Sequence, residues 1–230
     1  MRPLPRLLAF ADDRIAVLED LGVRAAAIAA AGPVVGLVAR LPQGSTDRLA
    51  ALALRFVALA TPPMASMFVT GRSDVAAATG AHGVILRKHD FCHPERSEGS
   101  PSPSRLTTAS SHRSVVAGSE IPRSAQDDMY VVKSIHSLAE AESAVASGAD
   151  ALVVGAIWPT STHPDRAAAG TALLRDVVTL GLPTFAIGGV TPARAVEARD
   201  AGAWGVAAIS ALWDANDPYA AAMEILQPWF

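Results

Sequence analysis

A glycine pair followed by a helix start is the clearest ligand-binding signal in this sequence. Gly188 and Gly189 end an apolar run, and Thr191-Pro192 then supplies the residue types of a helix N-cap and first helical position. Glycines allow a backbone to approach a ligand closely, and amide groups at a helix start attract phosphate. Ser210 ends the next apolar run before another helix start. These residues predict a phosphate site, with a tight turn that binds nothing as the alternative.

Hydroxyl and imidazole groups follow two other apolar runs. Thr160, Ser161 and Thr162 place three hydroxyl groups in a row, which suits a polar ligand or a phosphate, although a solvated loop fits the spacing equally well. His136 follows Ser134 by two positions. Because histidine ordinarily exchanges a proton near neutral pH, His136 is either an acid–base residue or a polar loop residue beside a helix cap.

Two charged residues complete the set of candidates. Arg40 ends one apolar run and Asp90 follows another. An aspartate at that place could hold Mg²⁺ beside phosphates, but a single carboxylate provides few of the ligands that the ion needs. A solvent-exposed charge or a surface ion pair is the simpler interpretation of Asp90 and Arg40. The six histidines show no metal-binding spacing, and Cys92 has no neighbouring group that would activate its thiol.

These candidates need a scaffold that brings the ends of several apolar runs together. The runs alternate with helical segments, predicted at residues 15–31, 48–59, 74–79, 137–147, 170–180, 192–200 and 218–226. The predicted strands are residues 6–11, 33–39, 65–70, 83–86, 129–133, 151–155, 183–187 and 203–209. Eight apolar strands separated by helices favour a closed (β/α)8 TIM barrel over an open doubly wound sheet. In such a barrel, the residues that follow the strands meet at one face.

One segment breaks the alternation. Residues 92–128 are rich in Ser, Pro, Arg, Glu and Thr and show no periodicity. A compact domain rarely contains so long a structureless loop, so we expect a disordered, low-complexity insertion after the fourth strand. The chain is then a single barrel domain, residues 1–230, interrupted by this insertion.

Composition bounds the class of protein. Half of the 230 residues are hydrophobic and 18% are charged, which allows a large core, and a net charge of −3 argues against a nucleic-acid partner. The single cysteine fits a cytoplasmic setting. The first apolar run is too short for a signal peptide, and no run approaches the ~18 residues of a membrane span. We therefore expect a cytoplasmic protein without a membrane partner.

Four segments of the C-terminal half resemble the thiamine phosphate synthase/TenI family. Residues 131–141 (VVKSIHSLAEA) resemble its G-x-S-x-H-S-x-x-E-A segment, with Lys133 in place of the usual glycine. Residues 147–162 (SGADALVVGAIWPTST) resemble its GADYvgvGPiFpTxT segment. Residues 185–192 (FAIGGVTP) are very similar to its AIGGIt segment, and residues 201–210 (AGAWGVAAIS) to its aGAdGvAvvS segment. In combination these motifs are specific.

The resemblance implies a (β/α)8 barrel of the thiamine phosphate synthase type that binds a thiazole phosphate. It implies that Ser134 lies near the diphosphate of a pyrimidine substrate in a true synthase. The residues that it implies around the thiazole phosphate are Thr160, Ser161, Thr162, Gly188, Gly189, Ile209 and Ser210.

The N-terminal half departs from the synthase pattern where diphosphate and metal would bind. The Q-x-R-x-K segment after strand two is reduced to Arg40, and Thr70-Gly71 stands where synthases have the Asn-Asp whose aspartate binds Mg²⁺. The segment after strand four, H-L-G-Q-x-D-L in synthases, keeps only Asp90. Because neutralising the leaving diphosphate requires such cations, these losses point to the TenI branch, which tautomerises a thiazole carboxylate phosphate. The resemblance implies that His136 moves the proton there.

Three functions remain open. The first is a TenI-like thiazole tautomerase with His136 as general acid/base and no cofactor. The second is a thiamine phosphate synthase, an enzyme that joins thiazole phosphate to hydroxymethylpyrimidine diphosphate and would use Mg²⁺ held by Asp90. The third is a barrel that binds a phosphorylated ligand without catalysis. In each case the expected partner is a small thiazole phosphate, with a homo-oligomer also possible.

Overall fold

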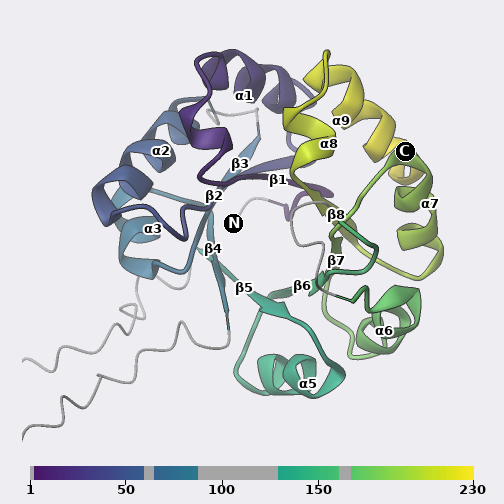
Figure 1. The fold of residues 1–230 in the computed structure, drawn as a ribbon. Helices are drawn as coiled ribbons and strands as arrows, with labels where there is room; N and C mark the ends of the chain where they lie inside the picture. The colour runs from purple at the N-terminus through teal and green to yellow at the C-terminus, as the bar shows by residue number, and fades with distance from the viewer. Residues whose placement is uncertain (1–2, 60–64, 88–128, 161–166) are drawn as a thin grey trace, which may run out of the picture.

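The computed structural model describes residues 3–59, 65–87, 129–160 and 167–230. Within them, eight parallel strands close into one barrel, and β1 pairs with β8 (Figure 1). The strands are β1 (Leu7–Ala11), β2 (Val35–Ala39), β3 (Ser66–Thr70), β4 (Gly83–Leu86), β5 (Tyr130–Ile135), β6 (Ala151–Gly155), β7 (Thr184–Ile187) and β8 (Gly205–Ala208). The closed strand order confirms the predicted (β/α)8 barrel and excludes the open sheet. The predicted insertion, residues 92–128, falls between β4 and β5 and lies outside the described residues.

Helices surround the barrel as an outer ring (Figure 1). They are α1 (Leu21–Ala29), α2 (Thr46–Leu59), α3 (Ser73–Thr79), α5 (Leu138–Ala146), α6 (Gly170–Val178), α7 (Pro192–Asp200), α8 (Ser210–Trp213) and α9 (Pro218–Leu226), with 3₁₀ turns η1 (Ile15–Val17) and η2 (Gln227–Trp229). In the described part of the chain, none of these helices is long and apolar enough to cross a membrane.

The strands are apolar on both faces because each face is buried in a different core. In β1, Leu7, Ala9 and Ala11 pack outward against the helices, whereas Leu8 and Phe10 point into the barrel. The inner core also contains Val38, Phe68, Ile85, Val132, Ala151, Val153, Phe185 and Ala207. The barrel is therefore packed solid below its mouth, as expected for eight strands.

The bounds of several predicted elements differ from the structure, and two of these differences are the most informative. The helix predicted at residues 15–31 is split into η1 and α1, because Leu18 adopts an extended backbone with a ψ of 133°. The fifth strand runs on through Ser134 to Ile135 instead of ending at residue 133. This extension matters for the site, because alternation along β5 turns Ser134 to the same face of the sheet as Val132, an inner-core residue.

At the N-terminal end of the barrel, the residues just before β1 contact the residue just before β8. The Arg6 guanidinium lies 3.5 Å from the centroid of the Trp204 ring and donates to the Trp204 carbonyl at 2.8 Å. The Trp204 indole in turn donates to the Pro5 carbonyl at 2.8 Å. These contacts join the starts of the first and last strands, so they help to hold the ring closed at the end opposite the mouth.

Candidate functional site

A cavity of about 780 Å³ opens at the carboxyl ends of the strands. Phe10, Val153, Ile187 and Ala207, from β1, β6, β7 and β8, line its apolar part. Residues that follow strands supply most of its polar groups. This is the face on which (β/α)8 barrels carry their ligand sites, because the strand ends and the loops that follow them converge there.

The glycine pair forms a turn in the wall of this cavity. Gly188 and Gly189 have φ angles of +97° and +65°, a region that residues with a Cβ rarely adopt. A Cβ on Gly188 would lie 2.7 Å from the Ala156 Cβ, and one on Gly189 would overlap the Pro159 carbonyl oxygen. The turn is thus enclosed from behind by the loop that follows β6, and only glycine fits at both positions.

The carbonyl groups of this turn are held by donors outside it. The Gly188 carbonyl accepts from the Trp158 amide at 3.4 Å, and the Gly189 carbonyl accepts from the Arg194 guanidinium at 2.6 Å. In a trans peptide the N–H points opposite to the C=O, so these bonds also fix the directions of the Gly189 and Val190 amides. The turn therefore presents a fixed pair of amides rather than a mobile glycine loop.

His136 lies at the cavity wall directly after β5. Its Nδ1 is hydrogen-bonded to the Gly155 carbonyl at the end of the neighbouring strand β6, and its backbone amide donates to Glu140 Oε2 at 2.8 Å. A carbonyl oxygen can only accept, so Nδ1 carries the proton. In the neutral ring the lone pair then belongs to Nε2, which is the nitrogen able to take a proton from a ligand.

The helix start that follows His136 explains its placement. Ser137 is the N-cap of α5, and its hydroxyl oxygen accepts from the Glu140 amide at 3.3 Å. Glu140, at the third helical position, reaches back to the backbone before the cap, in a variant of the capping box. The sequence S-x-x-E thus fixes both the helix start and the backbone of His136.

Most of the predicted site residues share this one cavity. Besides His136 and the glycine pair, the cavity lining includes Arg40, Ser134, Thr160, Ile209 and Ser210. Three predicted residues, Asp90, Ser161 and Thr162, lie outside the described residues, so their roles stay predictions. The predicted residues that line the cavity come from five of the eight strand ends, those of β2, β5, β6, β7 and β8, which explains why they are scattered over the sequence.

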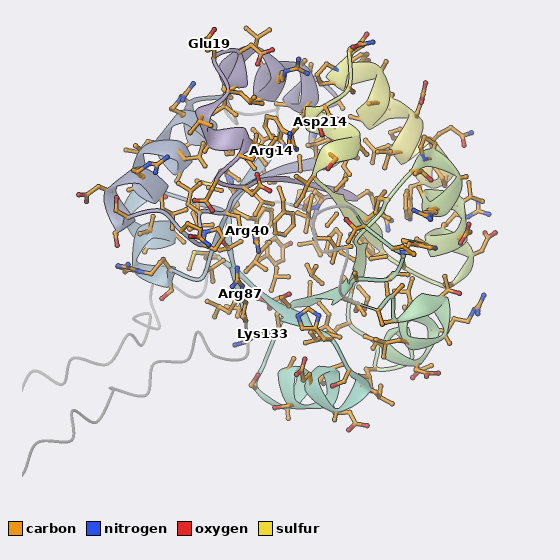
Figure 2. The ribbon with its side chains drawn as sticks, viewed as in Figure 1. Arg14, Glu19, Arg40, Arg87, Lys133 and Asp214 are labelled. Carbon is orange, nitrogen blue, oxygen red and sulfur yellow. The ribbon has the colours of Figure 1, made fainter. Side chains whose placement is uncertain are left out.

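Positive charge gathers on one side of the mouth. Figure 2 shows Arg40 and Arg87, which follow β2 and β4, along the same side of the opening, and both line the cavity. Burial lowers the pKa of Arg40, and the neighbouring charge of Arg87 lowers it further, while Asp12 and Asp13 oppose this effect. An anion bound between the two guanidinium groups would relieve their repulsion.

Metal-binding donors are sparse in the described residues. No group of three or more His, Cys, Asp or Glu side chains there is arranged to hold a metal ion. Thr70 and Gly71, at the end of β3, contribute no carboxylate. Mg²⁺ can be held by one or two carboxylates together with substrate phosphates, and Asp90, the predicted ligand, lies outside the described residues, so this metal site stays a prediction.

Sequence reasoning missed two charged residues of the cavity wall. Arg194 and Glu140 both line the cavity. Each occupies the third helical position after its N-cap, Thr191 or Ser137, on a helix that begins at the barrel mouth. The signal was present in the sequence as T-x-x-R and S-x-x-E, but it becomes informative only once these helix starts are known to face the site.

Comparisons with known proteins agree with this architecture. A family model described as thiamine monophosphate synthase matches residues 116–212. The thiamine-phosphate synthase of Mycolicibacterium gilvum (strain PYR-GCK) is 36% identical over 159 residues, which are 68% of this chain and 56% of that protein. The enzyme of the same name from Streptomyces avermitilis is 43% identical over 100 residues, or 42% of this chain and 46% of that protein. The chain thus spans about half the length of these relatives.

Solved structures extend the likeness to nearly the whole chain. Thiamine phosphate pyrophosphorylase from Pyrococcus furiosus superimposes with a TM-score of 0.68 at 27% identity, over 97% of this chain and 94% of its own. A 3-hexulose-6-phosphate synthase, with a TM-score of 0.60 at 20% identity over 97% and 99% of the two chains, shares the fold alone. Given the family model, the relatives and the shared barrel, this chain belongs to the thiamine phosphate synthase/TenI family.

Proposed function

We propose that the cavity binds a thiazole carboxylate phosphate and that the protein converts one tautomer of this ligand into another. The observation that carries the proposal is the setting of His136, whose Nδ1 is fixed on the Gly155 carbonyl at the cavity wall. A ring held in this way keeps one nitrogen, Nε2, for proton transfer.

The proposed reaction needs only one proton-transfer group. Nε2 of His136 takes a proton from one atom of the ligand, which leaves a delocalised anion, and the resulting imidazolium returns a proton to another atom. The composition and net charge of the ligand are unchanged, so no co-reactant is required. Glu140 keeps the backbone of His136 in place while the ring passes through its charged state.

The two anionic ends of such a ligand suit the two sides of the cavity. We assign the phosphate to the side of Gly188, Gly189, Ile209 and Ser210, together with the hydroxyl group of Thr160. The carboxylate then faces Arg40, with Arg87 beside it. This orientation supports the tautomerase assignment, because it leaves His136 beside the heterocycle between the two ends.

A second candidate is thiamine phosphate synthesis, which the names of the curated relatives favour. In that reaction Arg40 and Ser134 would contact the diphosphate of the pyrimidine substrate. Mg²⁺ would neutralise the leaving diphosphate, and its predicted ligand, Asp90, lies outside the described residues. A barrel that binds a thiazole phosphate without turnover is the third candidate.

The test follows proton exchange and tautomer conversion of the thiazole carboxylate phosphate by NMR. Wild type is compared with His136→Gln. The glutamine amide can still donate a hydrogen bond to the Gly155 carbonyl, but it cannot take up a proton from the ligand near neutral pH. We expect the variant to bind the ligand with similar affinity and to convert it at least ~100-fold more slowly. The same assay is run with Mg²⁺ and with hydroxymethylpyrimidine diphosphate added.

Each candidate gives a different result. Tautomer conversion that is lost in His136→Gln and proceeds equally fast with and without Mg²⁺ supports the tautomerase. Mg²⁺-dependent formation of thiamine phosphate, without conversion of the carboxylate ligand, would replace it with the synthase. Binding by wild type without any turnover would leave a non-catalytic binder.

A further inference from the structure

The first two turns of α7 contact both loops that enclose the glycine turn. Arg194 donates to the Gly189 carbonyl at 2.6 Å, and its guanidinium carbon lies 5.9 Å from the centroid of the Trp158 ring. Three residues later, Glu197 accepts from the Trp158 indole at 3.0 Å. One helix therefore fastens the loop that follows β6 and the loop that follows β7 to each other.

Arg194 determines how one peptide of the cavity wall is oriented. Gly189 and Val190 both line the cavity, and the peptide between them carries the carbonyl that Arg194 holds. Because this peptide is a planar unit, turning its carbonyl also turns the Val190 amide. Without the guanidinium, Gly189 would be free to explore other backbone angles, and the amide would lose its fixed direction.

The charge of Arg194 is not neutralised by a contact within the described residues. Its guanidinium there bonds a neutral carbonyl and lies near a neutral ring. By contrast, Arg14, Arg24, Arg72 and Arg199 each form an ion pair with an aspartate. The carboxylate of Glu197, one turn further along α7, accepts from the Trp158 indole. Within the part of the chain that the structure describes, Arg194 thus brings a cation without a paired carboxylate, and further N–H donors, to the cavity wall.

We infer that Arg194 is both a positioning residue and a binding residue of an anion site in this cavity: it orients the Gly188–Gly189 turn and adds positive charge beside it. The ligand class is a phosphate monoester, whose charge and acceptor oxygens match a guanidinium next to backbone amides. This inference rests on the proposed phosphate site and adds to it a side chain that selects a charged group over a neutral one.

The experiment uses inorganic phosphate as the probe and Arg194→Ala as the variant. Arg199→Ala is the matched control, because Arg199 lies on the same helix and pairs with Asp200 at the surface. We expect Arg194→Ala to weaken phosphate binding by about tenfold or more and Arg199→Ala to leave it unchanged. Unchanged phosphate affinity in folded Arg194→Ala would overturn the binding role.

A second readout needs no ligand. In the ¹⁵N NMR spectrum of the free protein, we expect Arg194→Ala to shift the amide signals of Gly189 and Val190, and Arg199→Ala to leave them in place. If wild type binds no phosphate, the proposed phosphate site fails and the positioning role is decided by these signals alone. Unshifted signals in Arg194→Ala would overturn that role whatever the binding result.

Arg194→Lys separates the two contributions. Lysine keeps the charge but lacks the planar set of donors that reaches a carbonyl and a ligand at the same time. We expect part of the phosphate affinity to return while the signals of the turn stay displaced. Signals returning to their wild-type positions in Arg194→Lys would contradict the role assigned to the guanidinium.

Discussion

At the scale of single residues, the site depends on groups that are fixed by their neighbours before any ligand arrives. Nδ1 of His136 is fixed by the Gly155 carbonyl, and the Gly189 carbonyl is fixed by Arg194. Such prior fixing lowers the cost of ordering these groups when a ligand binds. The glycines of the turn contribute differently, because their lack of a Cβ gives the turn the room it needs.

Gly189→Ala tests the space around the turn. Alanine at a φ of +65° is strained by ~1–2 kcal/mol, and its Cβ would also lie 2.9 Å from an Arg194 nitrogen and overlap the Pro159 oxygen. Gly148→Ala is the control, because Gly148 has a φ of +78° with nothing within 4 Å of an added Cβ. We expect both variants to lose stability in thermal unfolding and only Gly189→Ala to lose affinity for a phosphorylated ligand. Equal ligand affinity in the two variants would contradict a ligand contact at the turn.

At the scale of elements, helix starts at the barrel mouth carry side chains that the strands cannot supply. The cap of α5 places Glu140 against the backbone of His136, and the start of α7 places Arg194 against the glycine turn. These helices therefore act as supports for the loops that precede them. Asp217, the cap of α9, has the same chemistry but does not line the cavity.

Two cap deletions separate stability from function. Ser137 and Asp217 accept from the amides of Glu140 and Ala220, at 3.3 and 3.0 Å. Replacing either by alanine should cost about 1 kcal/mol of unfolding free energy in denaturant titrations. Only Ser137→Ala should also slow the proposed proton transfer by His136, because its helix start holds the backbone of that residue. If Asp217→Ala slows proton transfer as much as Ser137→Ala does, the slower rate reflects lost stability and not the backbone of His136.

At the scale of the whole molecule, a solid inner core supports an open mouth. Phe68, completely buried, fills the space above two glycines of the neighbouring strands: a Cβ on Gly36 would lie 2.9 Å from its ring, and one on Gly83 would overlap it. Because the two neighbouring glycines have no side chains, the large Phe68 ring fits within the narrow interior of the barrel. The cavity at the mouth therefore lies above a tightly packed inner core, which holds the strand ends in fixed positions.

Phe68→Ala should be among the most damaging single substitutions. Removing a buried phenyl ring from a packed interior costs about 3–5 kcal/mol, through lost burial and the cavity left behind. Phe230→Ala, at a residue that is 74% exposed, is expected to cost little. Chemical denaturation of the two variants checks this contrast. Similar unfolding midpoints would mean that the inner core relaxes far more than its packing indicates.

The chain between β4 and β5 offers a second test at this scale. The two strands are adjacent and parallel, with Gly83 beside Tyr130 and Leu86 beside Lys133, so a connection must return along the full strand length. Parallel neighbours need a crossover of about a dozen residues or more. Replacing residues 92–128 with a flexible linker of about that length should keep the circular dichroism spectrum and ligand affinity. Loss of the folded spectrum would show that this segment is needed for the barrel to fold.

The sequence by itself determined the barrel and pointed to most of the residues that meet in the cavity. Continuous apolar runs marked all eight strands, because strands that are buried on both faces must be apolar throughout. Cavity residues such as Gly188 and His136 directly follow strands that these runs had already indicated. Only the tertiary structure decided that β1 pairs with β8, that Ser134 belongs to a longer β5, and that Arg194 reaches the glycine turn. Strand closure and helix-to-loop contacts join residues far apart in the chain or on different elements, and local periodicity carries no record of which distant partner a side chain will meet.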